Sequence, residues 1–124
     1  MIYQKNIKKQ LSPRFNSSEF DCPCNHCTTT LIDPQLIADL EDLRAMVGLP
    51  LLVSSGYRCE AHNIAIGGAK NSSHTNGRAA DLVCSDMDKL YAACEKIFNA
   101  VGDGRKKGFV HVDTRSDKVR RWNY

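Results

Sequence analysis

The spacing of apolar and polar positions predicts three helices. The first is expected from Asp33 to Gly48, because an Asp cap and Pro34 at the first helical position favour its start and a glycine ends it. A short second helix is expected over residues 59–65, and a third follows a Ser85 cap. The apolar stripes that these helices would bury recur every three to four residues. They are Leu36, Leu40, Leu43 and Val47 in the first helix, and Leu90, Ala93, Cys94 and Ile97 in the third.

Three further stretches predict strands, at 51–55, 79–83 and 108–114. In the last of these, Val110 and Val112 alternate with His111 and Asp113, which places the two polar side chains on one face. The remaining segments are an arm or first edge strand at 1–14, a turn built from 102–104 and 105–108, and a tail at 116–124. Helices grouped against a small, mostly antiparallel sheet predict an α+β fold, and residues 1–124 are expected to form a single domain.

Composition and charge narrow the function classes. The chain has 124 residues, 42% of them hydrophobic and 25% charged, with a formal charge of +3. This mild charge favours a solvated basic surface over nucleic-acid binding, although basic clusters could help approach to an anionic polymer such as the bacterial wall. No apolar run has transmembrane length, and the N-terminus lacks the apolar core of a signal peptide. We therefore expect synthesis in the cytoplasm, with delivery to any external substrate by another agent.

Two histidines and a carboxylate are the candidate metal ligands. His74 and Asp81 lie in one polar stretch, and His111 follows about thirty residues later. Two imidazoles and a carboxylate suffice for a catalytic zinc, which keeps its fourth position open. They converge if Gly77 turns the chain and 79–83 runs back beneath the site as a strand. Spacing alone favours structural histidines over ligands, so the prediction depends on the surrounding motifs.

The six cysteines suggest a second site. Cys22, Cys24 and Cys27 crowd one loop together with His26, whereas Cys59, Cys84 and Cys94 stand singly. In a reducing compartment such a loop is more often a metal site than a disulfide framework. Three thiolates with Cys59 or His26 as the fourth ligand would form a structural zinc site. A disulfide that involves Cys59, or free thiols, are the alternatives. Cys94 is interpreted as a core residue.

Six separated motifs fall in the order and spacing of the zinc D-Ala-D-Ala carboxypeptidases. They are Ser54–Cys59, His62-Asn63, Gly67-Gly68, Ser72-x-His74, Gly77-x-Ala79-x-Asp81 and His111-x-Asp113. From about Phe15 to Arg115 the chain resembles this family, and more narrowly its short phage-type peptidoglycan peptidases, which are similar in fold to the hedgehog signalling domain. The resemblance also favours Cys59 as the partner of the cysteine loop, because similar sequences carry cysteines at both places.

The resemblance implies a zinc peptidase that hydrolyses an amide bond in the peptide stem or cross-link of peptidoglycan. It implies zinc ligation by His74, Asp81 and His111, where zinc polarises the scissile carbonyl and supplies hydroxide at neutral pH. It also places Arg58 on the substrate's carboxylate or carbonyl, a natural partner for a guanidinium fork. Ser72 matches a serine that hydrogen-bonds substrate. The alternatives are a structural salt bridge for Arg58 and a loop-stabilising role for Ser72.

The general base is where the sequence departs from the family. Many members carry Asp or Glu three residues before the last metal histidine, and Gly108 stands there. Asp113 is the first replacement candidate, because it shares a strand face with His111; its rival role is to orient a ligand imidazole. Asp103, between two glycines, is the second candidate.

Two function classes therefore compete. The first is a monomeric phage lysis enzyme, released by a holin, or a tail-associated enzyme carried on a virion. The second is a non-catalytic zinc-containing module that binds the wall or a protein. The similarity to hedgehog domains supports this alternative, because that scaffold can keep its zinc while serving as an interaction domain.

Overall fold

The computed structural model describes residues 1–115 and 117–124. A five-stranded sheet in the order β3-β4-β6-β5-β7 forms its centre. The strands are β3 (Leu52–Ser55), β4 (Ala79–Val83), β5 (Ala100–Gly104), β6 (Phe109–Asp113) and β7 (Arg120–Asn123). All neighbouring pairs are antiparallel except β5 and β7, which run parallel. A separate antiparallel pair joins β1 (Ile2–Gln4) to β2 (Thr29–Leu31).

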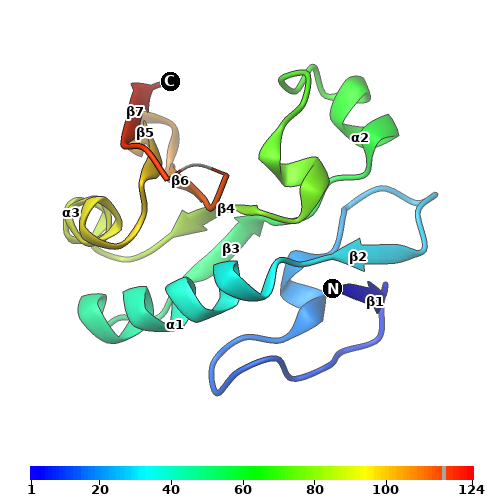
Figure 1. Ribbon diagram of the computed structural model, residues 1–124, viewed down its shortest axis with the longest axis horizontal. Coiled ribbons are helices and arrows are strands. Elements are labelled where there is room, and N and C mark those ends of the chain that lie inside the picture. Colours follow the sequence, from blue (N-terminus) through cyan, green and yellow to red (C-terminus); the bar gives the residue numbers. More distant parts are fainter. Residues whose placement is uncertain (116) are drawn as a thin grey trace.

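Two helices, α1 (Pro34–Val47) and α3 (Met87–Ile97), pack against each other beside the sheet (Figure 1). The α+β class is thereby confirmed. The Asp33 side chain accepts a hydrogen bond from the backbone N–H of Gln35, and Gly48 ends α1 at φ 72°, so this helix has its expected bounds. A short helix, α2 (Glu60–Ala65), stands on the other side of the molecule from α3. No helix within residues 1–115 and 117–124 is long and apolar enough to cross a bilayer.

Three single turns of 3-10 helix connect these elements. They are η1 (Ser17–Phe20), η2 (Ser73–Asn76) and η3 (Arg105–Lys107). Asn16 caps η1 through its side chain, and Glu19 completes a capping box by accepting from the Asn16 backbone N–H at 2.8 Å. Asp86, rather than the expected Ser85, caps α3 by accepting from the Lys89 backbone N–H.

The hydrophobic core lies between the two long helices and one face of the sheet. Leu82, Val110 and Val112 are fully buried there, and Leu40 and Leu90 pack with them in the same cluster. Because side chains alternate along a strand, the opposite face of β4 and β6 carries polar residues. They are Asp81, His111 and Asp113, with Asp81 directly opposite His111 across the pair. The sheet therefore brings two of the predicted ligands together.

Besides the cap of α3, two predictions about local structure were wrong. Residues 102–104, expected as a turn, belong to strand β5. Both positions need glycine because aromatic rings fill the space of a side chain: a Cβ at Gly102 would lie 2.6 Å from Trp122 Nε1, and one at Gly104 would lie 2.6 Å from Phe109 Cζ. Residues 120–123, expected within a tail, form β7 against β5.

Candidate metal centre

The turn η2 positions the first predicted ligand. Ser72 caps the turn by accepting a hydrogen bond from the His74 backbone N–H at 3.2 Å, and Gly77 ends it at φ 71°. A Cβ at Gly77 would lie 2.3 Å from the carbonyl oxygen of Leu31, so only glycine fits. The chain then enters β4, which carries Asp81 back towards His74. His74 itself is buried.

Three potential ligand atoms face one another at this place. Nε2 of His74 lies 3.2 Å from Nδ1 of His111, and Oδ1 of Asp81 lies 3.3 Å and 3.0 Å from these two nitrogens. Ligand atoms at tetrahedral positions around zinc, with bonds of about 2.0–2.1 Å, are separated by about 3.3 Å. The observed spacing therefore fits a zinc ion in the middle, and the three predicted ligands are brought together.

The hydrogen-bond partners of the two imidazoles fix which nitrogens are free to bind a metal. Nδ1 of His74 lies 2.7 Å from the carbonyl oxygen of Gly56, which can only accept, so Nδ1 carries the hydrogen and Nε2 presents a lone pair. Nε2 of His111 lies 2.7 Å from Oδ2 of Asp113, and the same reasoning leaves a lone pair on Nδ1. Two lone pairs and a carboxylate oxygen converge, an arrangement that a divalent cation satisfies.

The close approach of these groups shifts the pKa values of Asp81 and His111. Burial raises the pKa of Asp81, but the imidazoles of His111 and His74, when they are protonated on the nitrogens that face it, outweigh burial and hold that pKa well below its usual range. Burial lowers the pKa of His111, but the carboxylates of Asp113 and Asp81 outweigh it and raise the pKa above its usual value. The centre therefore favours an ionised Asp81 next to positive charge, whether a proton or a metal ion supplies it.

Asp113 lies behind His111, away from the three ligand atoms. Its side chain is fully buried. Oδ2 accepts from His111, and Oδ1 accepts from the backbone N–H of Arg115 and from its Nε, both at 3.2 Å. Both oxygens of Asp113 therefore have partners, and the one on His111 contacts the ring nitrogen that faces away from the centre.

Asp103 is not brought to the site. It pairs with Val110 across β5 and β6, so its side chain lies on the face opposite His111. There its carboxylate receives hydrogen bonds from Nε and Nη2 of Arg105 at 2.9 Å and 2.7 Å. Gly108, where many family members carry an acid, ends η3 at φ 90°.

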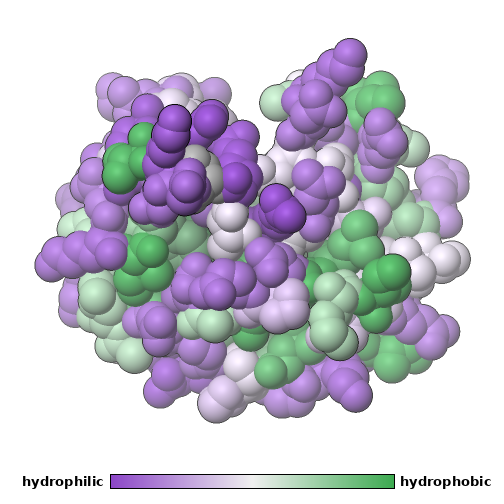
Figure 2. All heavy atoms as spheres, in the orientation of Figure 1, coloured by the Kyte–Doolittle hydropathy of each residue, from purple (hydrophilic) through white to green (hydrophobic). Residues whose placement is uncertain are grey.

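A cleft of about 360 Å³ opens beside the centre. Its walls come from the loop between α2 and η2 and from residues near the end of the chain. The lining residues are Arg58, Gly67, Gly68, Ala69, Ser72, Ser73, His74, His111, Arg115, Trp122 and Tyr124. Figure 2 shows the surface hollowed at the top of the view, between the part that carries β5 and β7 and the part that carries α2. The candidate ligands thus border a space that a substrate could enter.

Arg58 is fixed at the edge of this cleft. Its Nε donates to Ser55 Oγ at 3.3 Å, its Nη1 donates to Asn63 Oδ1 at 2.9 Å, and its Nη2 lies 3.8 Å from Oδ2 of Asp81. The guanidinium therefore forms an ion pair with Asp81 and also lines the cleft, where a substrate could reach it. Ser72 likewise lines the cleft while it caps η2.

Sequence reasoning assigned no role to the residue that supports Arg58. Asn63 is buried, accepts from Arg58, and donates to the carbonyl of Ala69 at 3.0 Å. A Cβ at Gly68 would lie 2.0 Å from Oδ1 of Asn63, which explains a glycine there. One residue of each motif therefore takes part in a single contact. Asn63 of His62-Asn63 packs against Gly68 of Gly67-Gly68, and this contact holds the cleft wall in place.

Sequence reasoning also missed the aromatic wall. The indole of Trp122 lies 5.3 Å from the His111 ring, and the Arg115 guanidinium lies 5.1 Å from the indole. The ring of Tyr124 lies 6.4 Å from that of Trp122. The signal was present in the alternation of residues 120–124, which places Trp122 and Tyr124 on one face of a strand.

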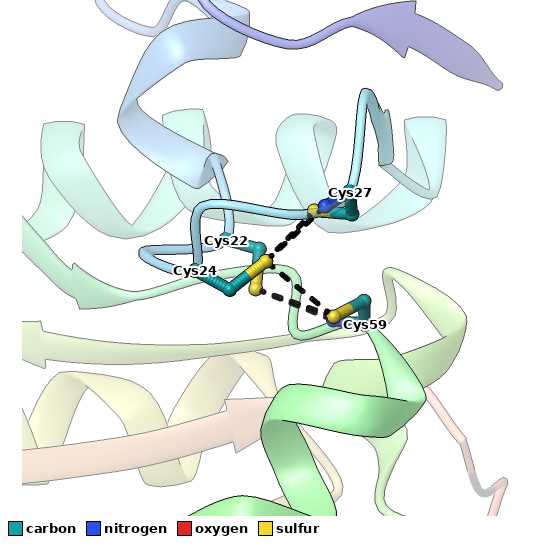
Figure 3. Close-up of side chains that lie close together, drawn as sticks. All are labelled: Cys22, Cys24, Cys27 and Cys59. Carbon is teal, nitrogen blue, oxygen red and sulfur yellow. Dashed lines mark hydrogen bonds between the residues drawn. The ribbon is translucent and has the colours of Figure 1, made fainter.

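The four cysteines of the second predicted site also come together, at the start of α2 and separate from the sheet centre (Figure 3). All six cysteines lie in the described ranges, and no two of them form a disulfide. Cys94 is buried in the core, as expected.

Comparison with known proteins agrees with the motifs. A family model described as Peptidase M15 matches residues 13–113, which is most of the chain. The search of curated proteins found no match to the chain. The matched range includes every element that supplies a candidate metal ligand. The chain therefore belongs to the peptidase M15 family, the zinc D-Ala-D-Ala carboxypeptidase family of metallopeptidases that its motifs resemble.

Proposed function

We propose that this protein is a zinc-dependent peptidase that hydrolyses an amide bond in the peptide stem or cross-link of peptidoglycan, as a D-Ala-D-Ala carboxypeptidase or endopeptidase does. The observation that carries the proposal is the convergence of His74, Asp81 and His111 at a cleft with two arginines in its lining. Family membership supports the reaction class.

The ligand set accounts for the chemistry. A zinc ion held by three protein ligands acts as a Lewis acid on the scissile carbonyl and activates water at neutral pH. His74 and His111 offer one nitrogen each, because Gly56 and Asp113 hold the hydrogen on the other nitrogen. We assign Asp113 the orienting role rather than that of general base, since one of its oxygens is bonded to His111 and the other to Arg115, and Asp113 itself does not line the cleft.

Arg58 is proposed to bind the substrate. A peptide stem that ends in a free carboxylate presents a planar anion, which a guanidinium matches with two parallel hydrogen bonds. Ser55 and Asn63 hold Arg58 in one place, so little side-chain freedom is lost on binding. Ser72 is proposed to donate its hydroxyl hydrogen to the substrate, because its oxygen already accepts from His74.

A second candidate function is a non-catalytic zinc-containing module that binds the wall or a protein. One observation favours it. Among the residues that the structure describes, none that lines the cleft is a carboxylate, and Asp103 lies on the other face of the sheet. A peptidase with this lining would release the proton of the attacking water to solvent, whereas a binding module needs no proton acceptor.

The setting that we propose is phage lysis or a tail-associated role, in which a monomer reaches the wall through a holin-made lesion or on a virion. The resemblance to phage-type peptidoglycan peptidases supports this setting. The basic balance of +3 suits an anionic polymer.

Digestion of purified peptidoglycan separates the two functions. The protein is incubated with peptidoglycan with and without a chelator, and mass spectrometry identifies the released stems. We expect zinc-dependent release of fragments cut at one amide bond, and none from His111→Ala. Co-sedimentation with peptidoglycan and no released fragment, at full zinc content, would favour the binding module.

A further inference from the structure

Four thiols from two distant segments meet at one point. Cys22, Cys24 and Cys27 come from the loop after η1, and Cys59 comes from the N-cap position of α2. Figure 3 shows all four sulfur atoms pointing towards a common centre. Three of the sulfur–sulfur distances are 3.3 Å for Cys24 to Cys27, 3.6 Å for Cys24 to Cys59, and 3.9 Å for Cys22 to Cys59.

These separations fit a tetrahedral metal site better than a disulfide. A disulfide needs about 2.05 Å between sulfur atoms. Four thiolates around zinc, with bonds of about 2.3 Å, are about 3.8 Å apart along each edge of the tetrahedron. The three sulfur–sulfur distances given above, 3.3–3.9 Å, lie close to the second value, and all four sulfur atoms lie within 4.8 Å of one another. The four cysteines are thus arranged around a space of the right size for one ion.

Each sulfur atom also faces a nitrogen donor. Backbone N–H groups donate to three of them at 3.4 Å: Cys27 to Cys24, Cys59 to Cys22, and His62 to Cys59. The ammonium of Lys5 lies 3.4 Å from the sulfur of Cys27 and 3.7 Å from that of Cys24. A neutral thiol accepts hydrogen bonds weakly, whereas a thiolate accepts them well. The surroundings therefore suit four thiolates, and Lys5 offsets part of the charge of minus two that a zinc tetrathiolate carries.

We propose that Cys22, Cys24, Cys27 and Cys59 bind one structural zinc ion as a closed tetrathiolate site. Four soft ligands in a tetrahedron select zinc or iron among the common metals. Zinc is chosen because all four positions are filled by protein, as in structural zinc sites. His26 is exposed and lies outside the cluster, so Cys59 supplies the fourth ligand.

Such a site joins the N-terminal part of the chain to the wall of the cleft. Cys59 follows Arg58 directly, and the backbone N–H of Tyr57 donates to the carbonyl of Phe20 at 2.8 Å. The zinc would therefore fix the segment from which Arg58 reaches the cleft. Zinc binding by the four cysteines does not depend on hydrolytic activity.

A variant that lacks the sheet centre isolates the cysteine site. The chain with both His74→Ala and His111→Ala is purified without chelator, and its metals are counted by mass spectrometry. We expect one zinc per chain in this variant, two in the wild type, and none when Cys24→Ser is added. His26→Ala in the same background is the matched control and should keep its zinc. Cobalt replacement should give the intense near-ultraviolet charge-transfer absorption of thiolate ligands in the double variant.

A second measurement covers the case in which Cys24→Ser does not fold. A mercurial reagent is titrated into the wild-type protein, and released zinc is followed with a chromogenic chelator; one zinc should leave as four thiols react. Iron in place of zinc, a mass lower by two hydrogens per disulfide, or a metal-free double variant with four unmodified thiols would each overturn the proposal.

Discussion

The two clusters of candidate ligands differ in how completely they would surround an ion. The sheet centre offers two imidazoles and one carboxylate from three separate elements, and it borders a cleft of about 360 Å³. The cysteine cluster offers four thiols, which fill every position of a tetrahedron. An ion with a free position can bind substrate or water, whereas a fully enclosed ion can only hold the chain together. We therefore assign a catalytic role to a metal ion at the sheet centre and a structural role to one at the cysteine cluster.

The supports of the two clusters differ in the same sense. In the sheet centre, side-chain and carbonyl acceptors hold each imidazole in one tautomer, which tunes the nitrogen that faces the ion. Around the cysteines, backbone N–H groups and Lys5 serve to offset negative charge. A metal that takes part in a reaction needs ligands held in a fixed orientation, whereas a structural metal with four thiolate ligands needs their excess negative charge offset.

The largest expected effect comes from removing a ligand of the sheet centre. His111→Ala should lose the zinc of that centre and lower the rate of stem-peptide hydrolysis by more than about 10³-fold, because the metal contributes several kcal/mol to the transition state. Metal analysis and a peptide assay test this together. A variant that keeps its activity while its total zinc falls by one would reverse the assignment of the two clusters.

The next effect concerns the orientation of that ligand. Asp113→Asn should weaken zinc affinity by about 10–100-fold, and added zinc should restore much of the activity. Titration of zinc into the variant during hydrolysis gives both its zinc affinity and the activity that zinc restores. If activity instead stays about 10²–10⁴-fold low at full zinc occupancy, Asp113 is a general base and the orienting role is wrong.

A smaller effect is expected at Arg58, which lies between the two clusters. Arg58→Ala should lower turnover of a stem peptide about tenfold to a hundredfold, since a charge-assisted contact contributes about 1.5–3 kcal/mol. Zinc content and melting temperature should change little. Arg58→Lys is the control, because it keeps the charge without the fork and should recover part of the rate. Unfolding of Arg58→Ala with no kinetic change in the folded fraction would identify a structural salt bridge.

The smallest effect is expected outside both clusters. The hydrogen bond from Arg105 outweighs burial and lowers the pKa of Asp103, so this pair stabilises the fold above the ordinary Asp pKa of about 3.9 and loses that contribution as pH falls through the lower folded value. Asp103→Asn should cost less than about 1 kcal/mol at pH 7 and leave hydrolysis unchanged. Urea unfolding of both proteins should show the difference shrinking towards pH 3. A large loss of activity would make Asp103 the base.

Much of this arrangement could be predicted because its signals are local. An Asp cap, a proline and a terminal glycine define α1, and alternation along β6 places His111 and Asp113 on one face. Strand β5 was missed because Gly102 and Gly104 are typical of turns, whereas glycine is needed here because the rings of Trp122 and Phe109 occupy the space that a side chain would fill. The orientation of Asp113 was also beyond prediction, because it depends on which nitrogen of His111 faces Asp81.

The parallel pairing of β7 with β5 has a consequence for the order in which the protein is made. Trp122 and Tyr124 line the cleft, and they are held there by a strand that is translated after every other described element. A chain that has emerged from the ribosome only as far as residue 115 already presents all the metal ligands but has only part of the wall around them. The enclosure is therefore completed after residue 124 emerges, so a partly synthesised chain would present an incomplete cleft inside the producing cell.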